Sequence, residues 1–254
     1  MRNRSVCAFL AGWLCCLMVA SSAWAGQVVT EEERNWARQA LAREAALDGA
    51  RMRDNTLAVS YFSNESGQPA LDSLRKGLAY MLITDLSRIK GLIVVERIKL
   101  QALIEELGLG ASGLVEAGTA PRVGRLLGAR FLVGGAISDG GASGQQAGET
   151  GGGMDIPIRI DPNLLNVPQG SLHPLPGVQG LINTLFQIEK QILFSIVERL
   201  EISLSEGEKA ALRVPMTTNA RALFSFFMGL NASDMQMYDQ AGAYYEKAVQ
   251  ADPG

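Results

Sequence analysis

The hydrophobic pattern changes its period several times between residues 57 and 138. Short apolar runs, typical of buried strands, alternate with segments in which apolar residues recur every three or four positions. The second spacing is that of a helix with one buried face. The expected strands are 57–62, 92–95 and 131–138, and the expected helices are 71–89, 97–107 and 119–127. This β-α-β-α-α-β order predicts an α/β fold in which helices pack on a mixed sheet.

The pattern differs on both sides of this block. Residues 30–50 predict a helix that Thr30 and Glu33 begin as a capping box. Residues 139–153 hold seven glycines and no large apolar side chain, which indicates a flexible loop. Alternating apolar residues at 154–160 then predict a strand of seven residues, at an edge of the sheet because Pro157 cannot donate a backbone hydrogen bond. Four further prolines predict an irregular stretch, followed by helices at 178–200 and 205–212.

The last segment carries a repeat-like pattern. With Pro253 set at the penultimate proline position of a tetratricopeptide repeat, small and aromatic residues fall where that repeat requires them. These residues are Gly229, Tyr238, Ala241, Tyr245, Ala248 and Pro253. Small residues let two helices approach, while aromatic residues fill the groove between repeats. We predict a tetratricopeptide-like helical hairpin, with an ordinary helical hairpin as the alternative. One such unit cannot bury its own face, so it must pack on the α/β domain or on another repeat.

The first 25 residues predict a cleavable secretory signal peptide. Arg2 and Arg4 precede an apolar run at 6–20, which is too short to span a bilayer comfortably. Ala23 and Ala25 then supply the small side chains that a signal peptidase recognises, which predicts cleavage before Gly26. The alternative is an uncleaved N-terminal anchor.

Cysteine positions and charge narrow the function classes. All three cysteines lie within the segment to be removed, which excludes disulfides, thiolate metal sites and cysteine nucleophiles from the mature chain. Removal of that segment also lowers the formal net charge from −3 to −5, and such a chain has no electrostatic footprint for nucleic acid. After the signal there is no apolar run long enough for a transmembrane helix.

Several short motifs occur in the order and spacing of a known family. They are carried by Phe62, Asn64, Ser66, Gly67, Gly77, Leu78, Asp85, Glu96, Arg97, Leu127, Gly128 and Ala129. Through them, residues 57–137 resemble the amino-terminal domain of the CsgG family, the curli-secretion channel proteins and their relatives. The fold implied is similar to that of the amino-terminal domain of the TolB family. The resemblance implies an envelope protein of a Gram-negative bacterium with a role in secretion or transport.

The chain also departs from that family. Its channel proteins are lipidated at a cysteine, whereas no cysteine follows Cys16 here. The family proteins insert two transmembrane hairpins per subunit, but a glycine-rich loop and one seven-residue strand occupy the corresponding stretch. We therefore carry over the scaffold that the resemblance implies, and not the pore.

No catalytic constellation can be assembled from the sequence. The single histidine, His173, lies in the stretch expected to be irregular, and one histidine cannot form a histidine-based metal site. The phosphate-binding loop and the G-x-S-x-G elbow are both missing. The acids that might be paired for acid–base chemistry are Asp85, Glu96, Glu105 and Glu106. Asp85 lies within an expected helix, and Glu96 with Arg97 begins the next one, where a cap or an ion pair explains it more simply. We predict no enzyme activity, no catalytic residue, no metal and no cofactor.

Together these patterns predict five segments. They are a signal peptide at 1–25, an N-terminal helix at 26–56, a CsgG-like α/β domain at 57–161, an irregular segment with helices at 162–215 and a helical hairpin at 216–254. We expect a non-enzymatic component of a secretion or surface-assembly system, in the periplasm or on the periplasmic face of the outer membrane. Its expected partners are envelope proteins, with a homo-oligomer and outer-membrane association also considered, and no nucleic acid. The alternative is a soluble periplasmic ligand-sensing module.

Overall fold

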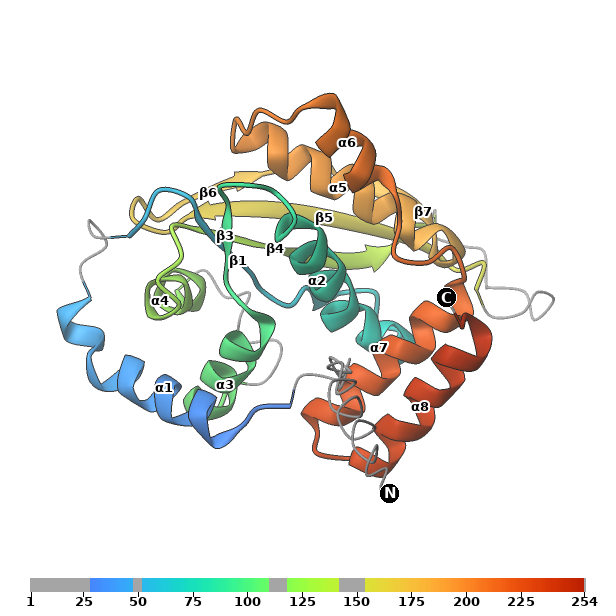
Figure 1. The fold of residues 1–254 in the computed structure, drawn as a ribbon, viewed down its shortest axis with the longest axis horizontal. Helices are drawn as coiled ribbons and strands as arrows, with labels where there is room; N and C mark the ends of the chain where they lie inside the picture. The colour runs from blue at the N-terminus through green and yellow to red at the C-terminus, as the bar shows by residue number, and fades with distance from the viewer. Residues whose placement is uncertain (1–27, 48–51, 110–117, 142–153, 254) are drawn as a thin grey trace, which may run out of the picture.

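The computed structural model describes residues 28–47, 52–109, 118–141 and 154–253. Within these ranges, seven strands form one mixed sheet (Figure 1). The strands are β1 (Thr56–Val59), β2 (Ser63–Asn64), β3 (Ile93–Val94), β4 (Phe131–Asp139), β5 (Pro157–Asn166), β6 (Ser171–Pro174) and β7 (Val178–Leu181). Their order is β3-β1-β4-β5-β6, with β2 beside β4 and β7 beside β5. β1 pairs in parallel with β3 and β4, and β2 pairs in parallel with β4. β5 pairs antiparallel with β4, β6 and β7.

Helices cover both faces of this sheet. The α-helices are α1 (Glu31–Ala42), α2 (Asp72–Leu86), α3 (Arg97–Leu107), α4 (Thr119–Leu126), α5 (Leu185–Arg199), α6 (Glu206–Arg213), α7 (Ala220–Asp234) and α8 (Tyr238–Ala251). Short 3-10 helices are η1 (Glu44–Ala46), η3 (Pro69–Leu71) and η4 (Ile182–Thr184). In Figure 1, α5 and α6 lie above the sheet, and α3 and α4 lie below it. The α/β fold with a mixed sheet and a C-terminal helical pair is as predicted.

The apolar periods place the first half of the fold as expected. Leu57 and Val59 of β1 are buried because this strand lies between two others and helices cover its faces. Leu74, Leu78 and Leu82 of α2 recur every four positions and are fully buried, which is the packed face that the spacing predicts.

The predicted edge strand is wrong in position and length. β5 spans ten residues and lies inside the sheet, between β4 on one side and β6 and β7 on the other. Pro157 is its first residue, where the carbonyl oxygen accepts from Gly140 N (3.2 Å) and no donor is required. Pro162 continues the strand opposite Gly135, and its carbonyl accepts from Leu175 N (2.9 Å).

The stretch after Pro162 is also more regular than predicted. It contains β6 and β7, so the helix expected from residue 178 begins only at Leu185. His173 lies on β6, where its Nδ1 accepts from Arg199 Nη2 (2.7 Å) and its Nε2 lies 3.1 Å from the Ser171 hydroxyl. At the N-terminus, the capping box of Thr30 is confirmed, but the helix ends at Ala42 and a short 3-10 turn follows.

Candidate functional site

The C-terminal hairpin is built around one close helix contact. A side chain at Gly229 of α7 would overlap the ring of Tyr245, so the glycine allows α8 to approach. Ala241 is buried in the same contact, and Tyr245 packs on Phe226 with ring centroids 5.8 Å apart. Ala248 is half-buried, while Tyr238 and Pro253 are exposed. The small-against-aromatic packing inside the hairpin therefore matches the sequence pattern, and the identity of the hairpin as a tetratricopeptide repeat stays a prediction.

The hairpin docks on the α/β domain through α7. Phe227 is fully buried, and its ring occupies the space that a side chain at Gly77 of α2 would fill. Beside it, the rings of Phe226 and Tyr80 lie 4.9 Å apart. Gly77 thus has a packing role: it opens a hole in the surface of α2 for an aromatic ring of α7. In Figure 1 α7 lies between α2 and α8.

A buried charge cluster lies at the end of the same contact. Asp234, the last residue of α7, receives two hydrogen bonds from Arg97 Nη1 (2.9 and 3.1 Å) and an ion pair from Lys76 Nζ (2.9 Å). The Arg97 and Asp234 side chains are 1% and 2% exposed. Arg97 also donates to the Tyr61 hydroxyl (2.9 Å), which donates to Gln101 Oε1 (2.9 Å). We call this set the seam cluster: Tyr61, Lys76, Arg97, Gln101 and Asp234.

The electrostatics of the seam cluster keep Arg97 charged and the Tyr61 hydroxyl protonated. Burial lowers the pKa of Arg97, but the contacts with Tyr61 and Asp234 outweigh it and hold the pKa above its usual value. Burial raises the pKa of Tyr61, so its hydroxyl stays protonated and can donate. Because one carboxylate contacts two buried cations, its loss would remove the negative charge that both share. The seam cluster therefore ties the hairpin to the domain.

A second buried cluster lies between α2 and α5. Lys190 pairs with Asp85 and lies 3.3 Å from Glu189 Oε2, and Arg88 pairs with Asp85 from the other side (3.1 Å). Glu189 is fully buried, and that burial raises its pKa to about 8, with Lys190 opposing the rise and Asp85 adding to it. We call this set the α5 cluster: Asp85, Arg88, Glu189 and Lys190.

The remaining family-motif residues shape turns and the core. The Asn64 side chain accepts from Ser66 N (3.1 Å) and donates to Gln68 O (2.9 Å), which closes the turn after β2. Gly67 and Gly128 have positive φ, the region that glycine adopts freely. Phe62, Leu78 and Ala129 are fully buried, Leu127 is buried beside them, and Glu96 precedes α3.

Sequence reasoning missed several partners of these motif residues. Asp234 and Phe227 meet Arg97 and Gly77 across more than a hundred positions, and no local pattern signals such pairs. Glu189 could have been found, since it falls on the apolar face of α5 between Leu185 and Ile192. The cleavage residues Ala23, Ala25 and Gly26 lie outside the described residues.

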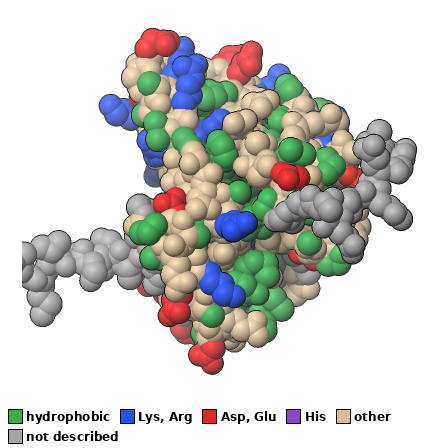
Figure 2. All heavy atoms as spheres, turned by 90° about the vertical axis from the view of Figure 1, so that its right-hand side faces the viewer, with side chains coloured by type: hydrophobic (Ala, Val, Ile, Leu, Met, Phe, Trp, Pro, Cys, Tyr) green, Lys and Arg blue, Asp and Glu red, His purple; other side chains and the backbone are tan. Residues whose placement is uncertain are grey.

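The outer face of α8 is exposed. Ala241 is the one fully covered residue of this helix, whereas Tyr238 is 52% and Val249 63% exposed. Met235 and Met237, in the turn before α8, are exposed as well. Figure 2 shows hydrophobic side chains gathered over the lower part of the side that carries the hairpin.

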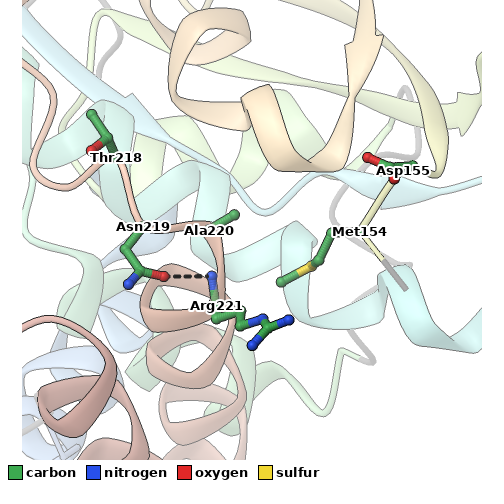
Figure 3. Close-up of a pocket in the computed structure, with 6 residues that line it drawn as sticks. All are labelled: Met154, Asp155, Thr218, Asn219, Ala220 and Arg221. Carbon is green, nitrogen blue, oxygen red and sulfur yellow. Dashed lines mark hydrogen bonds between the residues drawn. The ribbon is translucent and has the colours of Figure 1, made fainter. Parts of the chain in front are cut away.

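A hollow lies where the hairpin begins. It has a volume of about 590 Å³ and is lined by Met154 and Asp155 ahead of β5 and by residues 218–221. Asn219 caps α7 by accepting from Arg221 N (3.1 Å), and the Arg221 side chain points toward Met154 (Figure 3). The hollow is open to solvent and its cation is exposed, so we assign no ligand to it.

In the part of the chain that the structure describes, no three histidine, cysteine or acidic side chains come together as metal ligands. No helix in the same ranges has the length and hydropathy needed to cross a membrane.

Comparison with known proteins gives one family match. Residues 38–156 match the family model of the curli production assembly/transport component CsgG. This confirms the resemblance drawn from the motifs between Phe62 and Ala129. The match ends before β5, so it does not cover the hairpin. No curated protein sequence matches the chain.

Solved structures show weaker likeness. The C-terminal domain of LpoB from Salmonella enterica is 16% identical, over 59% of this chain and 97% of that one, with a TM-score of 0.36. Lipoprotein GNA1162 from Neisseria meningitidis is 13% identical, over 59% and 99%, with a TM-score of 0.38. Escherichia coli LpoB is 14% identical, over 71% and 82%, with a TM-score of 0.36. At these scores we transfer no function from them.

Proposed function

We propose that this protein is an exported, non-enzymatic component of a bacterial secretion or surface-assembly system. It works in the periplasm or on the periplasmic face of the outer membrane. Its CsgG-like α/β domain is a rigid platform, and its C-terminal hairpin holds a protein of the envelope. The CsgG match over residues 38–156 supports the envelope role.

The main observation behind the proposal is that α7 packs on the α/β domain while α8 lies on the outside. α7 is fixed to α2 by Phe227 and by Asp234 of the seam cluster. This leaves α8 outside, with Tyr238 and Val249 exposed on it. Exposed aromatic and aliphatic side chains on a rigid element are suited to protein contacts, because little conformational entropy is lost on binding. A helix that served only as a cover would turn its apolar side chains inward.

Two measurements test the proposal. Fractionation of the native host, with an alkaline wash of the membranes, locates the protein: we expect processed protein in the periplasm or released by the wash. Protein that stays in the cytoplasm with its N-terminus intact would refute export.

Cross-linking in the same cells then tests the hairpin. The variant Val249→Ser should lose its cross-links to envelope proteins, whereas Val214→Ser, an equally exposed valine (62%) ahead of α7, should keep them. Equal cross-linking of both variants would mean that α8 does not hold the partner.

A further inference from the structure

Gly242 is a helical glycine against which no neighbouring element of the described residues packs. It is the fifth of the 14 residues of α8, inside the helix, where glycine costs about 1 kcal/mol relative to alanine. Gly77 and Gly229 also lie inside helices, but each makes room for an aromatic ring of the next helix. At Gly242, apart from its chain neighbours and the backbone of its own helix, no atom of the described residues lies within 4 Å of the position that a side chain would take. A backbone exposed in this way allows another helix to approach closely.

The residues around Gly242 are arranged symmetrically along the helix. Tyr238 lies four positions before it and Glu246 four positions after it. Exposed apolar side chains lie seven positions away on both sides, Met235 (60% exposed) in the turn and Val249 on the helix. At 100° per residue, 238, 242, 246 and 249 fall within one stripe of the α8 surface. Tyr238, Gly242 and Glu246 are all exposed.

We propose that this stripe is a self-association surface, on which α8 pairs antiparallel with α8 of a second copy and crosses it at Gly242. Antiparallel pairing about Gly242 brings residues equally far before and after it together. The Tyr238 hydroxyl then donates to the Glu246 carboxylate of the second copy, and the reverse pair forms as well. Val249 meets the apolar side chains at the Met235 end. Such an interface is self-complementary, as a two-fold dimer requires.

Charge argues against the parallel arrangement. Parallel helices would place Glu246 against Glu246 of the second copy, and equal charges in contact destabilise an interface. Among the ion pairs of the described residues, none involves Glu246 or Asp239, so both acids are available to an outside donor. The antiparallel arrangement supplies the Tyr238 hydroxyl as that donor.

The size of the surface sets the strength of the pairing. α8 has 14 residues and is therefore about 21 Å long. One face of such a helix is smaller than the about 800 Å² per partner of a standard interface, so we expect a weak, concentration-dependent dimer. The inference rests on the proposed function in one respect: it names a second copy as a partner of the same exposed face.

Sedimentation equilibrium of the processed protein tests the surface. Gly242→Gln fills the crossing point with a long side chain and should weaken the dimer by about tenfold or more. Gly207→Gln is the matched control, because Gly207 is an exposed helical glycine with equally open surroundings on α6. We expect wild type and Gly207→Gln to dimerise alike.

Cysteine cross-linking tests the direction. Since no cysteine follows Cys16, Gly242→Cys should give a disulfide-linked dimer under oxidation, and Gly207→Cys should not. Tyr238→Cys alone and Glu246→Cys alone should give no disulfide-linked dimer. A mixture of the two variants should give one, because residue 238 of one copy meets residue 246 of the other. A monomer at all concentrations, or cross-linking of Gly242→Cys no better than Gly207→Cys, would overturn the inference. If envelope proteins were still captured in cells, the proposed function would survive that result.

Discussion

Glu189 of the α5 cluster is a fully buried carboxyl group, and its replacement tests whether it makes the stability of the protein depend on pH. Burial raises its pKa from 4.5 to about 8, against the opposing effect of Lys190. The folded protein therefore keeps this proton up to about pH 8, whereas the unfolded chain releases it near pH 4.5. Because the unfolded state binds fewer protons between these values, the free energy of unfolding falls as the pH rises through this window.

The size of the pKa rise sets how much stability the protein loses as the pH increases. One pH unit corresponds to about 1.4 kcal/mol for one fully uncoupled proton. The rise from 4.5 to about 8 then corresponds to a loss of at most about 5 kcal/mol between pH 5 and pH 9. The opposing effect of the Lys190 ammonium group, 3.3 Å from the carboxylate, is already contained in this rise. Glu189→Gln removes the titrating carboxyl group and keeps the side-chain volume. The free energy of unfolding of this variant should therefore not fall between pH 5 and pH 9 through residue 189.

Urea unfolding at pH 5, 7 and 9 measures the effect. We expect Glu189→Gln to be more stable than wild type at pH 9 by about 2–4 kcal/mol, and the difference to shrink at pH 5. Glu198→Gln is the matched control, since Glu198 is exposed on the same helix and should leave the wild-type pH dependence unchanged. If Glu189→Gln lost stability with rising pH as steeply as wild type, Glu189 would not carry the titration.

The seam between the α/β domain and the hairpin gives the remaining predictions. Asp234→Asn should lower the free energy of unfolding by about 3–5 kcal/mol in thermal melts, because Arg97 and Lys76 keep their buried charges; a loss below about 1 kcal/mol would contradict the role of the seam cluster. Phe227→Ala should cost about 3–5 kcal/mol in urea unfolding, as expected for a fully buried ring. Gly77→Ala should cost about 1–3 kcal/mol in wild type and much less in the Phe227→Ala background, whereas additive costs would show that the two positions are independent.

The sequence was a good guide where burial follows a single period. The strand at Leu57 and the helix through Leu78 were predicted because their apolar faces repeat at fixed spacing. The prediction is wrong between Pro157 and Leu181, where the prolines predict interruptions of the sheet and the structure has three strands. In β5 the prolines lie at positions where the strand needs a hydrogen-bond acceptor and not a donor. The Pro162 carbonyl oxygen, for example, accepts from Leu175 N. That distinction depends on the pairing of strands, which the sequence does not reveal.

Of the candidate site, the sequence singles out the residues of the α/β domain but not their partners on α7. The family motifs singled out Gly77 and Arg97, and the hairpin was expected to need a surface to pack on. Which surface, and through which residues, depends on contacts such as Arg97 with Asp234. A glycine and an arginine in the motif gave no sign that they would receive an aromatic ring and a carboxylate from the same helix.

α2, α7 and α8 pack one on the next, and their glycines give a further argument about how the hairpin works. Gly77 on α2 receives Phe227 of α7, and Gly229 on α7 receives Tyr245 of α8. Each helix thus accepts its outer neighbour at a glycine, so the same packing device repeats from the domain outward. Gly242 on α8 continues this series with nothing against it in the described residues. Because a glycine inside a helix weakens that helix unless a close contact compensates, the series favours a further helix on this face, which the proposed second copy would supply.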